Sequence, residues 1–287
     1  MNWQRSIFIL TCQGLAGIAQ ADATHMGIEA ALAHESNIGR AEYSRDVQED
    51  TAFQVGANIS RSVRITANSG LVARAGIQLQ EQAHYDNLSL AAAGAGIRYR
   101  LQPFPGFTTP WIDLSLGAER LEYRDSEIRD GWVSSLGVAA GKYFTDKLRM
   151  TGGWMAERRH AENGRVFDLR NHGWHLGIDF HLTPQASLYA KATRIFGDQV
   201  SSAFQSSVSG NPLRYSAQTP DAALSEHGNS RNAYRFDAVT NTMELGYNHA
   251  IRGNMAFDIS ARYFDADAEG GHTYHGYSAR AGLLYQF

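Results

Sequence analysis

The sequence predicts an all-β protein: a transmembrane, up-and-down antiparallel β-barrel of about twelve strands. Three observations predict it. Apolar and polar residues alternate with a period of two in segment after segment, and the links between these segments alternate between short and long. Beyond the N-terminal segment, no apolar run approaches the about 20 residues of a spanning helix. In a barrel only alternate residues face lipid, so no window of the sequence needs to be hydrophobic throughout.

The N-terminal segment reads as a secretory signal peptide over residues 1–21. An apolar run at 7–18 is too short for a membrane anchor, and a small-x-small cleavage site ends at Ala21. Cleavage there removes Cys12, the only cysteine of the 287 residues. The mature chain, 22–287, is then one barrel domain without disulfides or thiolate metal sites.

The last segment, 277–287, shows the strand pattern most clearly. Every second residue is apolar or aromatic, and the residues between them are mostly polar or small, so a strand here has one apolar and one polar face. An even strand number places both termini on one side, which we take as periplasmic. The same alternation predicts strands at residues 27–34, 53–60, 71–80, 91–101, 112–119, 132–140, 148–156, 174–182, 188–193, 242–248, 255–263 and 277–287.

The links between these segments support the same topology. Short periplasmic turns and long external loops are typical of outer-membrane barrels, whereas a soluble β-sandwich would show no strict alternation. A propeller would show a sequence repeat, and none is found. The short links are 102–110, 144–147, 183–185 and 250–254; the long ones are 35–50, 122–130, 158–172, 197–232 and 265–272; and 81–87 is a short exception.

Aromatic residues gather near the predicted strand ends. Rings with a polar tip prefer the level of the lipid headgroups, so we expect aromatic girdles there, although β-propensity alone also enriches aromatic residues in strands. The candidates are Tyr99, Phe104, Phe107, Trp111, Tyr143, Phe144, Trp154, Tyr247, Tyr263, Tyr285 and Phe287.

Two motifs resemble those of known proteins. The end of the chain, with Tyr285 and Phe287, resembles the aromatic C-terminus of Gram-negative outer-membrane β-barrels, which the barrel assembly machinery recognises. Residues 34–41 (His-Glu-Ser-Asn-Ile-Gly-Arg-Ala) resemble the start of outer-membrane porins, where a Tyr-Asp-Ser-Asn run and an Arg-Ala pair follow the first strand. Related openings occur in the barrels of surface lipoprotein assembly modifiers. Here His-Glu replaces Tyr-Asp and no helical repeat precedes the barrel, so this motif implies no activity or binding residue.

The polar faces of the predicted strands carry charges of both signs. A pore that selects anions would show an excess of Arg and Lys, and this set shows little excess. The charges therefore form either a salt-bridge network that stiffens the wall or the lining of a narrow polar channel. The lumen-facing candidates are Glu29, Arg74, Arg98, Arg100, Asp113, Glu119, Arg149, Glu157, His175, Asp179, Lys191, Glu244, Asp258, Arg262 and Arg280.

Other kinds of site have weaker support. His175, Asp179 and His181 share a face, but positions four apart on a strand are about 13 Å apart, which disfavours a metal site. No cofactor is expected. No spacing of Ser and His singles out a nucleophile and base, so catalysis as a lipid hydrolase or deacylase is only an alternative. In the link 197–232, the Ser, Asn, Gln and Ala content favours an external loop over an inward plug.

Two functions follow from these expectations. The first is a porin-like passive channel for small hydrophilic solutes in the cell outer membrane, with membrane lipid as its surroundings and no nucleic acid as partner. The alternative is a non-conducting structural or secretion-associated barrel that engages an exported protein or polysaccharide. Conductance in planar bilayers separates the two.

Overall fold

The computed structural model describes residues 23–204, 216–225, 230–269 and 271–287. The expected signal peptide lies outside these residues, so the division at residue 21 stays a prediction. No helix among the residues that the structure describes has the length and apolar character needed to cross a bilayer.

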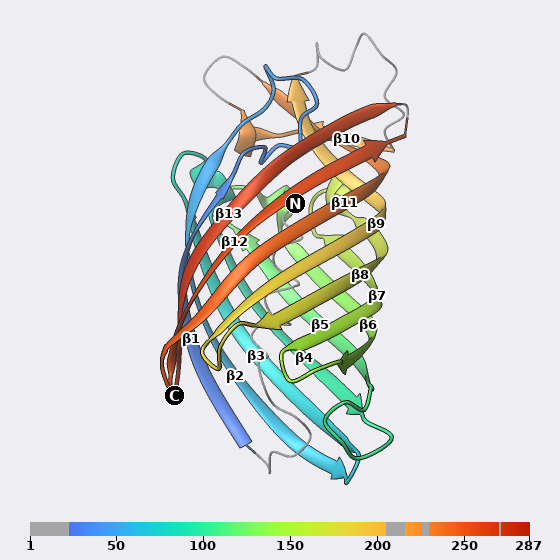
Figure 1. The fold of residues 1–287 in the computed structure, drawn as a ribbon. Helices are drawn as coiled ribbons and strands as arrows, with labels where there is room; N and C mark the ends of the chain where they lie inside the picture. Colours follow the sequence, from blue (N-terminus) through green and yellow to red (C-terminus); the bar gives the residue numbers. More distant parts are fainter. Residues whose placement is uncertain (1–22, 205–215, 226–229, 270) are drawn as a thin grey trace.

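Twelve of the described strands form a closed antiparallel ring, as the sequence predicts (Figure 1). Each strand pairs with its neighbours in chain order, and β1 pairs with β13 to close the ring. The ring strands are β1 (Ala23–Glu35), β2 (Asp50–Thr66), β3 (Ser69–Gln82), β4 (Leu90–Leu101), β5 (Trp111–Tyr123), β6 (Gly131–Tyr143), β7 (Leu148–Ala161), β8 (Leu169–His181), β9 (Ala186–Phe204), β11 (Arg231–Arg252), β12 (Met255–Ala268) and β13 (His272–Gln286).

One short strand, β10 (Ala217–Pro220), stands outside the ring. It pairs with β11 from Ala217 opposite Arg235 to Pro220 opposite Asn232. This stretch of β11 lies beyond the end of β12, whose pairing with β11 stops at Ala238. The sequence did not predict β10 because four residues are too few to show an alternation.

The two ends of the barrel differ in their connections, and we call them the turn end and the loop end. At the turn end, β1 begins and β13 finishes, with Gly27 opposite Gln286, so both described chain ends lie at one rim. The connections there are residues 67–68, 102–110, 144–147, 182–185 and 253–254. The loop-end connections include residues 36–49, 83–89, 124–130 and 162–168, and the described residues 216–225 lie at the same end.

The outer surface of the ring is apolar over the middle of every strand. On β8, for example, Trp174 is 60% exposed and Leu176 49%, while the residues between them point inward and are partly buried. Large exposed apolar side chains repeat in this way around the ring. Such a surface is stable against acyl chains and unstable in water, and the closed ring satisfies every strand's backbone hydrogen bonds, as a bilayer requires.

The strands are longer than the alternation predicts. β8 begins at Leu169 instead of 174, β9 runs to Phe204 instead of 193, and β11 begins at Arg231 instead of 242. The physical reason is the outer face, which becomes polar toward the loop end, as at Arg170 and Asp237. The alternation of apolar and polar residues therefore ends before the strand does.

Two of the expected girdle residues point inward instead. Trp111 is 6% exposed, and Tyr143 stacks on Phe107 with ring centroids 4.5 Å apart and lies 5.5 Å from Trp111. Both fall on the inner parity of their strands, so they fill the lumen at the turn end. Tyr285 and Phe287, 38% and 70% exposed, are on the outside.

Candidate functional site

The charged residues predicted for the inner face lie on the less exposed side of their strands. Glu29 and Glu157 are buried, at 6% and 8% exposure. The other candidates are partly buried and alternate with more exposed, mostly apolar neighbours: Arg74, Arg98, Arg100, Asp113, Glu119, Arg149, His175, Asp179, Lys191, Glu244, Asp258, Arg262 and Arg280. The part that any of them plays in transport stays a prediction.

Six of these residues form three ion pairs between directly opposite positions of neighbouring strands. Arg100 and Asp113 form a bidentate pair with two N–O distances of 2.7 Å. Arg149 Nε lies 3.0 Å from an Asp179 oxygen. The third pair joins Arg262 Nε to Glu244 Oε2 at 3.0 Å. The side chains of the three pairs are 13% to 25% exposed, so water still reaches them.

A fourth group joins strands on both sides of the closing seam. Arg280 on β13 contacts Glu29 on β1 and lies 3.5 Å from Asp258 on β12. The hydroxyl of Tyr189, on β9, donates to Asp258, with both carboxylate oxygens at 3.2 Å. Because these residues come from four strands that lie within one arc of the ring, their bonds brace this part of the wall.

Several other charged residues stand opposite small residues. Arg74 pairs with Gly96, Glu119 with Gly94, and Glu157 with Ser135 in the strand register. A small partner leaves lumen volume for the long side chain. The wall is therefore polar and balanced in sign.

The residues His175 and Asp179, which were expected to share a face, do so. His175 and Asp179 both lie on the inner parity of β8, with Asp179 bound to Arg149. Across the part of the chain that the structure describes, no group of three or more His, Cys, Asp or Glu side chains is placed to hold a metal ion.

Three neighbouring connections at the loop end share one construction. In each, the last residue of a strand donates its backbone N–H to a Ser or Asp side chain seven positions later. A short 3-10 turn lies between the two and folds the connection inward. The bonds run from Gln82 N to Ser89 Oγ at 3.0 Å, from Tyr123 N to Asp130 Oδ1 at 2.7 Å, and from Ala161 N to Asp168 Oδ1 at 2.8 Å. The turns are η1 (Asp86–Leu88), η2 (Glu127–Arg129) and η3 (Arg165–Phe167).

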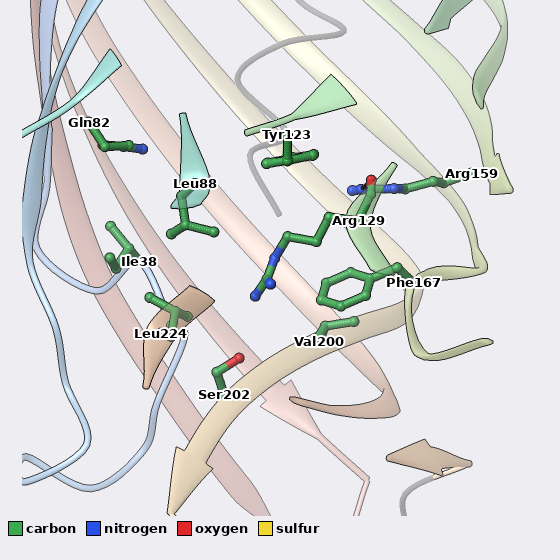
Figure 2. Close-up of a pocket in the computed structure, with 11 residues that line it drawn as sticks. Ile38, Gln82, Leu88, Tyr123, Arg129, Arg159, Phe167, Val200, Ser202 and Leu224 are labelled. Atoms are coloured by element: carbon green, nitrogen blue, oxygen red, sulfur yellow. Dashed lines mark hydrogen bonds between the residues drawn. The ribbon is translucent and has the colours of Figure 1, made fainter. Parts of the chain in front are cut away.

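These turns and a fourth, η4 (Ala222–Leu224), carry side chains that meet inside the loop end (Figure 2). Leu88 packs with Ala223 and Leu224, and Phe167 packs with Val166 and Val200. The space left among them is a cavity of about 50 Å³, room for a few water molecules. We call this layer the cap: Leu88, Arg129, Val166, Phe167, Asp221, Ala223 and Leu224.

A buried ion pair holds the cap together. Arg129 donates to both carboxylate oxygens of Asp221, at 2.7 and 2.6 Å, and its guanidinium lies 4.6 Å from the centroid of the Phe167 ring. Ser202 donates a further hydrogen bond to Asp221, and Arg159 donates to the backbone carbonyl of Arg129. Burial by itself raises the pKa of Asp221, but Arg129 and the hydrogen bonds outweigh it, so the pKa lies below its usual range.

Comparison with known proteins identifies the fold. No protein-family model matches the sequence, and no curated protein matches it. An outer-membrane channel from Pseudomonas putida F1 is similar in structure, with a TM-score of 0.58 and 9% identity over 93% of this chain and 96% of that one. This protein has the fold of an outer-membrane β-barrel. The outer-membrane phospholipase of Salmonella typhi matches at a TM-score of 0.45, with 10% identity over 91% and 90% of the two chains.

The residues of the barrel's cap were not predicted from the sequence. The link 197–232 was expected to be an external loop, and for Asp221 and η4 this was wrong, because they pack inside the cap. The one sequence signal is a Ser or Asp after each 3-10 turn, preceded by an apolar residue at the last or next-to-last position of the turn. That signal is too short to distinguish an inward turn from an exposed one.

Proposed function

We propose that this protein is an outer-membrane channel for small hydrophilic solutes, closed at its loop end by the cap. One observation carries the proposal. The paired charges along the wall remain 13% to 25% exposed, whereas the Arg129 and Asp221 side chains in the cap are 7% and 0% exposed. These three wall pairs are thus more accessible to water than the ion pair in the cap. The outer-membrane channel with the same fold agrees with this proposal.

The proposal places the protein in the cell outer membrane. It takes residues 1–21 as a cleaved signal peptide, the turn end as periplasmic and the loop end as external. Tyr285 and Phe287, exposed at the turn end, would then serve as the signal for the barrel assembly machinery. Both described chain ends lie at one rim, as this orientation requires.

The wall supports little selection by charge. Each ion pair sets a cation directly beside an anion, so their fields largely cancel along the solute path. We therefore propose diffusion of neutral or weakly charged hydrophilic solutes, without a cofactor.

A second candidate is supported by the closed cap itself. Side chains of η1, η3 and η4 pack into apolar clusters at the loop end, and a barrel whose cap never opens would not conduct. Such a barrel would act through its external connections, by engaging an exported protein or polysaccharide.

Planar-bilayer recordings separate the two candidates. We expect low conductance from the wild-type protein and a persistent increase from Arg129→Ala, because an unpaired buried Asp221 destabilises the closed cap. The matched control is Arg124→Ala, which removes an exposed pair with Glu81 near the same rim and leaves the cap intact. If hydrogen exchange shows an opened cap in Arg129→Ala and the conductance stays at the wild-type level, the channel proposal fails and the non-conducting barrel stands.

No catalytic activity is proposed. Incubation of the purified protein with phospholipid or lipid A, followed by analysis for released fatty acid, would reveal a hydrolase or deacylase. Turnover above that of a heat-denatured control would contradict this part of the proposal.

A further inference from the structure

Three arginines lie together on the outer surface of neighbouring strands toward the loop end. They are Arg158 on β7, Arg170 on β8 and Arg194 on β9, all exposed. The residues beside each of them in sequence are buried on the inner side, so the arginines have the outward parity of their strands. We call them the arginine patch.

The charge of the patch is not balanced by carboxylates. Arg158 and Arg170 stand directly opposite each other in the strand register, an arrangement in which like charges repel. Among the described residues, no carboxylate forms an ion pair with either guanidinium. The nearest acid in register, Asp198, accepts from the Arg170 backbone N–H at 2.8 Å and lies 3.9 Å from Arg235 Nε.

Another outward arginine at the same end shows the contrast. Arg120 on β5 is held by two carboxylates, with Glu162 Oε2 at 3.0 Å and Glu122 Oε1 at 3.4 Å. Its charge is compensated within the protein. The arginine patch therefore differs from Arg120, and an anion from outside would remove its repulsion.

The patch lies just beyond the lipid-facing surface. Trp174, 60% exposed, is on the outer face of β8 four positions from Arg170, about 13 Å at the rise of a strand. Arg194 stands opposite Trp174, and its guanidinium leans toward the loop end over the Phe196 ring, at 5.5 Å. The ring of His172 also stacks on Phe196, with the ring centroids 5.6 Å apart. A cation that leans away from the apolar surface over aromatic rings occupies the headgroup level.

The strands next to β9 carry the other sign, because β11 pairs with β9 and places Asp237 directly opposite Asp198. At the loop end of β11 and β12, the outward residues are Asp237, Asp265 and Asp267. These carboxylates border the arginine patch on the β11 side, so the patch is a local site on the outer wall of β7, β8 and β9 and not a general rim charge.

We propose that the arginine patch binds the phosphate groups of an anionic lipid in the leaflet at the loop end. The planar guanidinium matches phosphate geometry with two hydrogen bonds and holds its charge at every physiological pH. The lipid's acyl chains lie along the apolar strip that continues below the patch, over Trp174, Leu176 and Ile178. This continuity of charge and apolar surface favours a lipid over a soluble anion. The proposal requires membrane insertion and does not depend on conduction.

Titration of diphosphorylated lipid A into the full-length protein in neutral detergent, followed by native mass spectrometry, tests the proposal. Each arginine near a membrane surface contributes roughly a fivefold factor, so Arg158→Gln/Arg170→Gln/Arg194→Gln should weaken binding about a hundredfold. Lipid A without phosphate should bind wild type as weakly as the triple variant binds the diphosphorylated form. The matched control, Arg61→Gln/Lys147→Gln/Arg252→Gln, removes the same charge at the turn end and should keep the affinity.

Three results would overturn the proposal. One is an unchanged affinity in the triple variant, and another is an equal loss in the turn-end control, which would show general electrostatic attraction. The third is inorganic phosphate that competes as well as the lipid, which would mark a site for a free anion. Circular dichroism and gel migration with and without heating verify that each barrel is folded. Should the triple variant not fold, Arg158→Gln and Arg170→Gln are measured singly, each with an expected loss of roughly fivefold.

Discussion

Arg129 and Asp221, 92 positions apart in the sequence, form a bidentate ion pair with N–O distances of 2.7 and 2.6 Å in the interior of the cap. The carboxylate is fully buried and the guanidinium nearly so. Because both side chains are buried, a pair of this geometry joins η2 firmly to the chain next to η4. It also makes the closed loop end sensitive to the loss of either partner.

Removal of the carboxylate should release the cap. Asp221→Ala leaves Arg129 buried and unpaired, and loss of one partner of a buried pair costs about 3–5 kcal/mol. We expect faster hydrogen exchange at η2 and η4, with the strands protected as in wild type. The control is Arg129→Met/Asp221→Leu, which replaces both charges with apolar side chains and should exchange more slowly than Asp221→Ala. Equal exchange in the two variants would show that the ion pair does not hold the cap.

The closed cap should lose stability only in acid. The pKa of Asp221 is lower in the folded cap than in an open chain, where it is about 3.9. A lowered carboxyl pKa stabilises the folded form above the open-chain value, and this contribution disappears as pH falls through the folded value. Hydrogen exchange at η2 and η4 should therefore be constant from pH 7 to about pH 5, once corrected for intrinsic rates, and rise below about pH 4. Release of the cap near neutral pH would contradict this assignment.

A side chain at Gly246 should disturb the inner wall. The Tyr189 ring lies against this glycine, and a Cβ there would fall 2.1 Å from Tyr189 Cζ. In Gly246→Ala the ring must move and lose its bonds to Asp258, and forced overpacking of this kind typically costs about 1–3 kcal/mol. The heat-induced gel shift of the barrel should occur at a lower temperature. Gly253→Ala, with nothing within 4 Å of its Cβ, is the matched control and should leave that temperature unchanged.

A charged residue on the outer face should destabilise the barrel more the closer it lies to the middle of the bilayer. Leu245, 67% exposed in the middle of β11, should tolerate arginine poorly, at about 2–4 kcal/mol for a charge near the bilayer midplane. Asp267→Arg adds the same side chain to the exposed outer face of β12 at the loop end, beyond the apolar band. Urea unfolding in phosphatidylcholine vesicles should show a large loss for Leu245→Arg and a small one for Asp267→Arg. A similar loss for both would indicate that the apolar face does not meet lipid.

The sequence predicts the outward face well because period-two alternation is a local property of each strand. The segment 174–182 falls almost entirely within β8, with Trp174, Leu176, Ile178 and Phe180 all exposed. Trp111 and Tyr143 were wrongly expected in the aromatic girdle. An aromatic residue near a strand end can point either outward to the girdle or inward to the lumen, depending on which face of the strand its position occupies.

By itself the sequence determined the all-β barrel, about twelve strands, the placement of both chain ends at one rim and the balance of charge on the inner faces. Each of these follows from residues near one another along the chain. Only the tertiary structure decided that Arg100 meets Asp113, that Arg280 lies between Glu29 and Asp258, that Asp221 enters the cap, and that Arg158 and Arg170 stand side by side. These contacts depend on the register between strands and on how the connections fold, and alternation within one strand carries no information about either.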